Sequence, residues 1–349
     1  MRDSKFTTIK LMDIAKDNNQ TNGKKINYLP LVISAFVTLF LLIPVQITVK
    51  PPMILAERFV KGGGWVEIAL LTVYAVVLTY IILYKEKIRK VRLRYWLFFS
   101  VVFFMQLFLG LLVNEKFLMS GELHLPIPAL IVADPIYQPG GSLFMVFLLL
   151  STIAVLGPAW CSHLCYIGAW DGLASSKKRK PKPFGRKFTI FFRYFMLVSV
   201  VGVAFLMRLL HVPLSTAIVF AILFGIIELA LMYLVSFRFG YMFHCTTFCP
   251  IGSIVTLLSK LYPARIRINH STCTFCNACT VKCRYNALSG EDIKKGKAGW
   301  NCTLCGDCID SCHTDAIYLS FFGSKKNAWE YYIAVVIGVH TVFLALARL

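Results

Sequence analysis

The sequence has few acidic residues, and it lacks both a glycine-rich nucleotide fingerprint and an apolar N-terminal leader. Its 349 residues include 17 Asp and Glu against 37 Lys and Arg, which gives a net charge of +20. A cleaved signal peptide needs an apolar core, and the polar first 25 residues have none. The positive charge comes without a recognisable nucleic-acid-binding module, which argues against a nucleic-acid partner. Without a nucleotide fingerprint, the chain is expected to work as part of a complex.

Apolar residues dominate what is present. Hydrophobic residues make up 57% of the chain, whereas a soluble globular domain is nearer half apolar. Several apolar runs reach about 18 to 22 residues, which is long enough to cross a bilayer as a helix. The sequence therefore predicts a polytopic membrane protein with a small soluble part. The seven predicted spans are residues 30–48, 66–84, 95–113, 142–160, 188–208, 216–237 and 328–347.

Basic residues alternate between the two sides of these spans. Thirty Lys and Arg fall in the N-terminal tail and the loops on its side, against five in the opposite loops. Because cytoplasmic loops carry the excess of Lys and Arg, the N-terminus is expected inside and the C-terminus outside. Tyr95 and Trp96, at the start of the third predicted span, are expected to lie at the membrane interface.

Twelve cysteines fall on the predicted cytoplasmic side, where thiols stay reduced, so metal binding is favoured over disulfides. Eight of them form two C-x2-C-x2-C-x3-C runs, the bacterial [4Fe–4S] spacing, in which the fourth cysteine of each run ligates the other cluster. Zinc would leave four of the eight unexplained. The predicted ligands of cluster one are Cys273, Cys276, Cys279 and Cys312. Those of cluster two are Cys302, Cys305, Cys308 and Cys283.

The predicted fold class is a membrane all-α bundle of about seven transmembrane helices with an inserted bacterial-type 2[4Fe–4S] ferredoxin domain of the α+β kind. Residues 1–29 are expected to form a cytoplasmic polar tail, and residues 30–262 a six-helix transmembrane region with two hairpin repeats. Residues 263–325 are predicted to form the ferredoxin-like domain, and residues 326–349 a last transmembrane helix.

Four further cysteines form a repeated C-x3-C-x-I-G motif after the fourth and sixth spans: Cys161 and Cys165, then Cys245 and Cys249. If the helices continue, each pair shares one helical face, and adjacent hairpins would bring all four together. Three interpretations stay open: an additional iron–sulfur or other metal centre, a dithiol or docking feature, and small packing residues. His163 and His244 beside the motifs are candidate ligands or proton carriers, although hydrogen-bonded surface histidines are the simpler interpretation.

Residues 95–320 resemble the NapH-type membrane ferredoxins, the quinol-dehydrogenase membrane components of periplasmic nitrate reductase systems. NosR, MauN and CcoG proteins are similar. The resemblance rests on the eight ferredoxin cysteines, the two C-x3-C pairs and Pro250 after the second pair. The sequence departs from the family at Tyr166, which stands in place of the first proline, at Arg284 and His313, which replace proline after each ferredoxin run, and in its seventh span.

The resemblance implies an oxidoreductase subunit of a bacterial inner-membrane complex, which passes electrons between the quinone pool and a partner redox protein. Two [4Fe–4S] clusters, membrane lipid and quinone are the implied cofactors and partners. An alternative, suggested by the NosR and CcoG proteins, is a redox factor that helps to assemble another metalloenzyme.

Quinol oxidation releases protons, so carboxylates and histidines in or near the membrane are candidate catalytic groups. Glu228 lies inside the sixth span, where a carboxyl group is costly and is either a proton acceptor or a structural group. His340 in the seventh span raises the same question. His124 and Asp134 lie in the outer loop 114–141, although its Asp-Pro and Pro-Gly-Gly sequences also indicate turns.

Overall fold

The computed structural model describes residues 26–118, 125, 127–138, 143–324 and 326–346, and it is mostly helical. Most of the predicted N-terminal tail lies outside the described residues. His124 also lies outside them. Within the described residues, seven helices are long and apolar enough to cross a membrane, and each coincides with a predicted span. They are Leu29–Thr48, Gly63–Lys85, Ile88–Leu112, Phe144–Leu164, Arg186–Leu209, Leu214–Phe239 and Trp329–Leu346.

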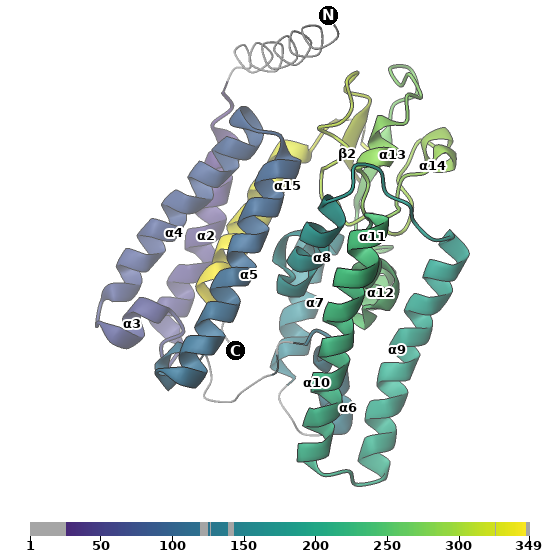
Figure 1. Cartoon of the computed structure of the whole chain (residues 1–349). Helices are drawn as coiled ribbons and strands as arrows, with labels where there is room; N and C mark the ends of the chain where they lie inside the picture. The colour runs from purple at the N-terminus through teal and green to yellow at the C-terminus, as the bar shows by residue number, and fades with distance from the viewer. Residues whose placement is uncertain (1–25, 119–124, 126, 139–142, 325, 347–349) are drawn as a thin grey trace, which may run out of the picture.

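The first, second and seventh of these helices pack together on one side of the molecule (Figure 1). They are α2 (Leu29–Thr48), α4 (Gly63–Tyr80) with its π-helical end η1 (Ile81–Lys85), and α15 (Trp329–Leu346). A short helix, α3 (Leu55–Phe59), connects α2 to α4. The approach of α15 to α2 is close, because a Cβ on Gly338 would lie 2.8 Å from the Val37 side chain.

Two helical hairpins make up the rest of the bundle. The first runs out through α5 (Ile88–Leu112) and back through α7 (Phe144–Leu156), and the second runs out through α9 (Arg186–Leu209) and back through α10 (Leu214–Leu231). The second hairpin continues through η5 (Met232–Ser236) and α11 (Phe237–Phe239). Between α5 and α7 lie η2 (Glu115–Phe117) and α6 (Leu130–Tyr137), of which α6 packs on α9.

The interfacial placement expected for Tyr95 and Trp96 is wrong, because both side chains are buried. Helix α5 begins at Ile88, about two turns before the predicted start, so these residues lie inside the bundle. Trp96 packs against Gly168 and Gly172, where an added Cβ would lie within about 3 Å of the indole ring.

Each hairpin ends in the same local structure. After α7 come η3 (Gly157–Ala159), the π-helical turn η4 (Trp160–Leu164) and helix α8 (Tyr166–Ser176). After α11 come the π-helical turn η6 (His244–Phe248) and helix α12 (Pro250–Leu258). The second cysteine of each C-x3-C motif is the extended residue that separates the π-helical turn from the following helix.

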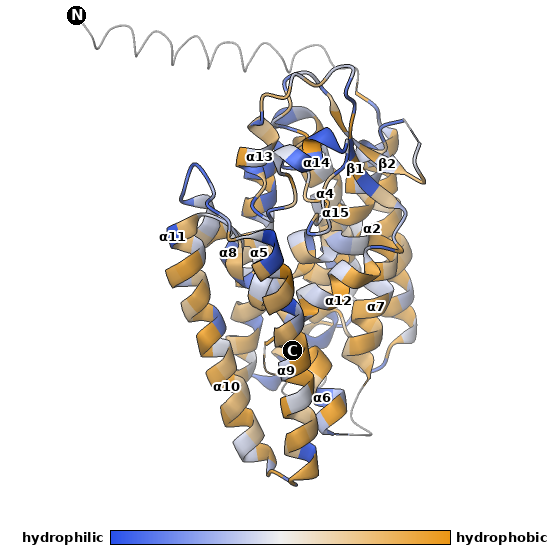
Figure 2. Ribbon diagram, turned by 90° about the vertical axis from the view of Figure 1, so that its right-hand side faces the viewer, coloured by the Kyte–Doolittle hydropathy of each residue, from blue (hydrophilic) through white to orange (hydrophobic). Residues whose placement is uncertain are grey.

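The cysteine-rich segment covers one end of the bundle (Figure 1). Its strands β1 (Ala264–Ile268) and β2 (Ile317–Phe321) pair antiparallel, with Ile268 opposite Ile317. Two short helices, α13 (Ala278–Lys282) and α14 (Gly290–Lys294), lie between the strands in sequence. Figure 2 shows that apolar residues dominate the long helices and that hydrophilic residues concentrate at this end.

Candidate metal centres

The structure gathers the eight cysteines of the ferredoxin-type runs around two cavities. The cavity lined by the first set contains Cys273, Cys276, Cys279 and Cys312. The cavity lined by the second set contains Cys283, Cys302, Cys305 and Cys308. Strand pairing explains the exchange of the fourth cysteine, because β1 leads into the first run and β2 leaves the second. We call these sets group one and group two.

The two runs share one backbone path. Left-handed residues stand two, four and thirteen positions after the first cysteine of each run, where the chain must curl around the cavity. In the first run they are Phe275, Asn277 and Asn286, and in the second run Leu304, Gly306 and Asp315. Backbone N–H groups donate to sulfur at equivalent places, from Ala287 to Cys283 and from Ala316 to Cys312, each at 3.3 Å.

These features suit iron–sulfur clusters, which are held by four thiolates and adjusted by hydrogen bonds to sulfur. A zinc site needs its ligands about 2.0 to 2.3 Å from one ion. In the part of the chain that the structure describes, no three His, Cys, Asp or Glu side chains are close enough to hold a single metal ion.

The condition under which each cysteine pair would share one helical face is not met, because the helix does not continue through either C-x3-C motif. The Cys165 and Cys249 N–H groups each donate to a carbonyl five residues earlier, at 3.1 and 2.9 Å, and the chain then becomes extended. In the second motif Pro250 has no N–H with which to continue the helix. In the first motif the Trp96 Nε1–H donates to the Cys165 carbonyl at 2.8 Å, and Tyr166 stands where the second motif has proline.

The glycine of each motif is explained by close approach. A Cβ on Gly252 would lie 2.8 Å from the Cys245 carbonyl oxygen, and one on Gly168 would lie 3.2 Å from the Cys161 carbonyl oxygen. The short helix after each motif therefore folds back against its own first cysteine. This shared geometry indicates that the two motifs are structural equivalents.

The four thiols of the two motifs lie close enough to interact, and we call them the four-thiol group: Cys161, Cys165, Cys245 and Cys249. Burial raises the pKa of the Cys245 and Cys249 thiols well above the usual value, and the charge of Cys165 in the other motif adds to this shift. A metal centre would supply the positive charge that thiolates need in such a place.

Two arginines connect the four-thiol group to group two, one from each hairpin. Arg92 in α5 donates from Nη1 to the Ser162 carbonyl at 3.1 Å. Arg193 in α9 donates from Nε to the Thr246 carbonyl at 2.7 Å. Both carbonyls follow the first cysteine of a motif, so the two arginines occupy equivalent positions.

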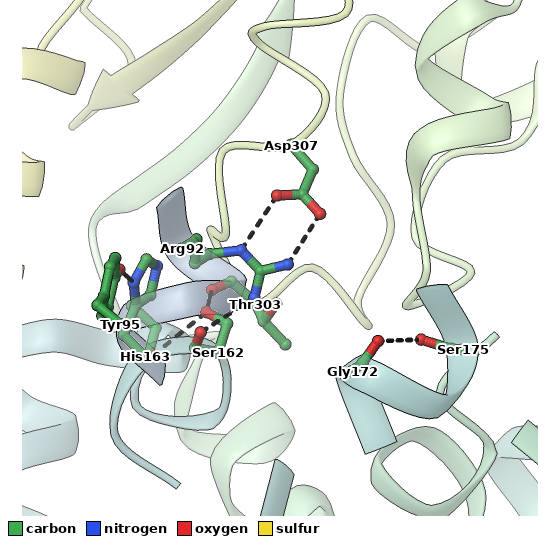
Figure 3. A network of polar contacts seen from close by, with 9 residues as sticks. Arg92, Tyr95, Ser162, His163, Gly172, Ser175, Thr303 and Asp307 are labelled. Carbon is green, nitrogen blue, oxygen red and sulfur yellow. Dashed lines mark hydrogen bonds and ion pairs between the residues drawn. The ribbon is translucent and has the colours of Figure 1, made fainter. Parts of the chain in front are cut away.

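Each arginine also reaches the group two loop. Figure 3 shows Arg92 in a two-pronged ion pair with Asp307, with N···O distances of 3.1 and 2.8 Å. The two side chains are only 5% and 2% exposed. Nearby, the Ser162 hydroxyl donates to the Thr303 carbonyl at 2.9 Å (Figure 3). Arg193 donates to Asn301 Oδ1 at 3.1 Å, so both hairpins hold residues 301–307.

Arg284 anchors the other side of the cysteine-rich segment. Its guanidinium donates to the Gly240 carbonyl and, at 2.5 Å, to the Lys178 carbonyl. Burial lowers the pKa of this guanidinium to about 10. The residue that stands where the family has proline thus ties the fourth cysteine of the first run to the ends of both hairpins.

Two buried carboxyl groups flank the four-thiol group. Glu228 is 2% exposed and interacts electrostatically with Cys165 and Cys249. Asp171 in α8 accepts the Cys245 N–H at 3.0 Å, and burial raises its pKa to about 6. One oxygen of each carboxyl group has no hydrogen-bond partner within the described residues. Asp134 lies in α6, at the opposite end of the bundle from the cysteine-rich segment (Figure 1).

The simpler interpretation of the two histidines beside the motifs, that they lie on the surface, is wrong. His163 and His244 are 0% and 1% exposed. His163 Nδ1 shares a hydrogen bond with the Tyr95 hydroxyl (Figure 3), and His340 donates from Nδ1 to the His163 carbonyl at 3.0 Å. Among the described residues, both His163 and His340 have an Nε2 atom without a partner.

Sequence reasoning missed Arg92, Arg193 and Asp171. Arg92 was one of six basic residues in an interhelical loop, and Asp171 lies in an ordinary helical sequence. The signal that could have found Arg193 is its isolation, because the other charge of its predicted span, Arg208, is the last residue of that span. Charged residues within spans usually face a partner or a cavity.

A family model described as a 4Fe-4S binding domain matches the chain twice, over residues 137–183 and 216–269. The matched stretches contain the two C-x3-C motifs and end before the first ferredoxin-type run. A protein of Methanocaldococcus jannaschii named as uncharacterized is 28% identical over 99 residues, which are 28% of this chain and 37% of that protein. The chain thus spans little more than a third of that relative. No solved structure matches.

The site and the family match define an iron–sulfur protein of the ferredoxin type. Its match to a 4Fe-4S binding domain is combined with seven helices, among the residues that the structure describes, that could span a membrane.

Proposed function

We propose that this protein is a membrane-bound component that passes electrons between the quinone pool and a partner redox protein. The 4Fe-4S match supports the iron–sulfur part of this proposal, and the seven apolar helices support a multi-pass setting. Iron–sulfur clusters, when bound, supply one-electron carriers whose potentials the surrounding protein adjusts. The distribution of Lys and Arg favours an orientation with the cysteine-rich segment on the cytoplasmic side, and the family resemblance implies a bacterial inner membrane.

Groups one and two are the proposed ligand sets of two [4Fe–4S] clusters, and the four-thiol group is the proposed ligand set of a third centre. The repeated positions of left-handed residues and of N–H donors to sulfur support the first two assignments. The third is supported by the convergence of the four thiols and by the two family matches, each of which covers one C-x3-C motif.

The observation that carries the proposal is the pair of buried arginines. Arg92 and Arg193 fix the backbone of both C-x3-C turns and also hold residues 301–307 of group two. Electron transfer between carriers depends steeply on their separation, so a fixed interface between two cysteine groups serves this function directly. A membrane anchor that only had to hold a soluble domain would not need hydrogen bonds from both hairpins to residues 301–307.

Glu228 is the proposed proton acceptor for quinol. Oxidation of a quinol releases two protons with its two electrons, and a positioned carboxylate accepts such a proton. The carboxyl group is buried on α10, whose other residues are half-buried or exposed, and it interacts with one thiol from each C-x3-C motif. It therefore lies between the lipid-facing side of the bundle and the four-thiol group.

The proposal can be tested with the full chain, purified anaerobically and placed in lipid nanodiscs. A reduced menaquinol analogue should reduce the clusters, which is followed by their visible absorbance and by electron paramagnetic resonance. Dithionite serves as the control reductant because it bypasses the quinol step. Clusters that dithionite reduces but quinol leaves oxidised would sink the quinone part of the proposal.

The assembly-factor alternative makes a different prediction in the cell. Deletion of the gene would then leave a partner metalloenzyme without its metal. If the partner enzyme is fully metallated but receives no electrons, the electron-transfer function is supported.

A further inference from the structure

The group one cavity opens to solvent at the loop of residues 274–277. Cys276 in this loop is exposed, whereas none of the group two cysteines is exposed. The neighbouring Phe275 is 47% exposed, although it is a large apolar side chain. Group one is thus the end of the cysteine series at which another protein can come closest.

A group of cations surrounds the helix that follows this loop. Lys282 in α13 interacts with positive charges from two other segments and from its own: Arg89 and Lys87 at the start of α5, Arg179 in the loop after α8, and Arg284. The structure holds these segments together, because Arg284 donates to the Lys178 carbonyl at 2.5 Å.

Nearby acidic groups do not cancel this positive charge. The negative charge of Asp307 is already paired with the guanidinium of Arg92. Asp310 interacts electrostatically with Lys87 and with the backbone at Ile88 and Arg89. The cations of α13 and of the two adjacent loops therefore outnumber the carboxylates that lie among them.

We propose that residues 274–277 and the cations Lys87, Arg89, Arg179 and Lys282 form the docking surface for an acidic electron-carrier protein. The inference rests on the proposed function and names the chemistry of its partner. Complementary charge steers two redox proteins together and suppresses wrong partners. Phe275 provides an apolar contact beside the exposed Cys276, which is where the two redox groups would come closest.

A protein fits this surface better than a lipid surface does. Anionic lipid headgroups would account for the cations of the loops after α4 and α8, which lie near the ends of the apolar helices. They would not account for an exposed aromatic and an exposed cysteine in the cysteine-rich segment, which lies beyond the helix ends (Figure 2).

The test measures binding rather than turnover. The full chain is placed in nanodiscs of neutral phosphatidylcholine and reduced with dithionite, and its Kd for flavodoxin, an acidic probe, is measured at several salt concentrations. Cytochrome c, a basic protein of similar size, serves as the control probe. Flavodoxin should bind more tightly than cytochrome c, and its binding should weaken about tenfold or more from low to high salt.

Matched charge reversals complete the test. Arg179→Glu should weaken flavodoxin binding about fivefold at low salt, whereas Lys50→Glu, on the opposite end of the helices, should change it less than about twofold. Equal Kd values for the two variants would overturn the proposal. Loss of binding of Arg179→Glu to phosphatidylglycerol vesicles, with an unchanged flavodoxin Kd, would assign the cations to lipid. Because no quinol is used, failure of the proposed quinol oxidation would not alter either result.

Discussion

Replacement of Arg92 by Met should open the interface between the group two loop and the first C-x3-C turn. The substitution keeps an unbranched apolar stem of similar length and removes only the guanidinium. It would remove both bonds to the Asp307 carboxylate and the bond to the Ser162 carbonyl. What remains is a carboxylate that is 2% exposed and has lost its cation.

The size of the effect follows from this burial. Removal of one partner of a buried ion pair costs about 3–5 kcal/mol, because the remaining charge is uncompensated. Each 1.4 kcal/mol is about a tenfold change in an equilibrium constant. If the interface opens as a local unit, the open population should rise about a hundredfold to a few thousandfold.

Hydrogen exchange followed by mass spectrometry measures this opening directly. Amide protection should fall by that factor in residues 301–307 and around Ser162, and it should be unchanged in α2 and α4. The matched control is Arg94→Met, two residues further along the same helix. Arg94 pairs with Glu86 at 3.0 Å, but the side chains are 69% and 41% exposed, so its loss should cost about 0.2–1 kcal/mol.

A double-mutant cycle decides whether the ion pair is the cause. In Arg92→Met with Asp307→Asn the uncompensated charge is gone, so much of the protection should return. Equal protection in Arg92→Met and Arg94→Met would refute the reasoning. So would a double variant that is no better protected than Arg92→Met alone.

Three further outcomes are expected. Replacement of Cys245 by Ser should lower the iron content by about four per chain and leave the group one and group two signals intact; an unchanged iron content would leave the four thiols as packing residues. Glu228→Gln should slow reduction by quinol about tenfold or more while dithionite reduction is unchanged, and an unaltered quinol rate would make this carboxyl structural. His340→Leu should cost about 1–3 kcal/mol, because the buried His163 carbonyl loses its donor. Thermal melting in detergent would show this, with Thr341→Val as the control, and equal melting of the two variants would contradict it.

The helices and the cysteine sets could be predicted because their signals are local. A membrane span is recognised from about 20 successive apolar residues. The seven predicted spans match the seven apolar helices of the described residues. The cysteine spacing pointed to iron–sulfur chemistry, which the 4Fe-4S match supports. The assignment of individual cysteines to individual clusters stays a prediction, although the structure places the same sets around its two cavities.

The turns at the C-x3-C motifs could not be predicted, because their causes lie elsewhere in the chain. The helix ends at Cys165, and the Cys165 carbonyl accepts a hydrogen bond from the indole N–H of Trp96, which lies 69 residues earlier in the chain. The same holds for Asp134 and Pro135, whose sequence indicates a turn but which lie inside α6. There the proline removes only one hydrogen bond of a short helix that packs on α9.

The seventh span, which the family resemblance left without a role, is the part of the bundle that connects two cysteine groups. At its start the Trp329 ring lies against Gly306 of the group two loop, where no Cβ could fit and φ is +82°. Three turns further on, His340 donates to the backbone of the first C-x3-C turn at His163. Tyr332 between them donates to the Leu156 carbonyl at 2.7 Å, at the end of α7. Helix α15 thus holds the group two loop and the first motif at a fixed separation from a third direction. The two arginines fix the same interface from the hairpins, so the placement of these two cysteine groups is determined by three separate helices.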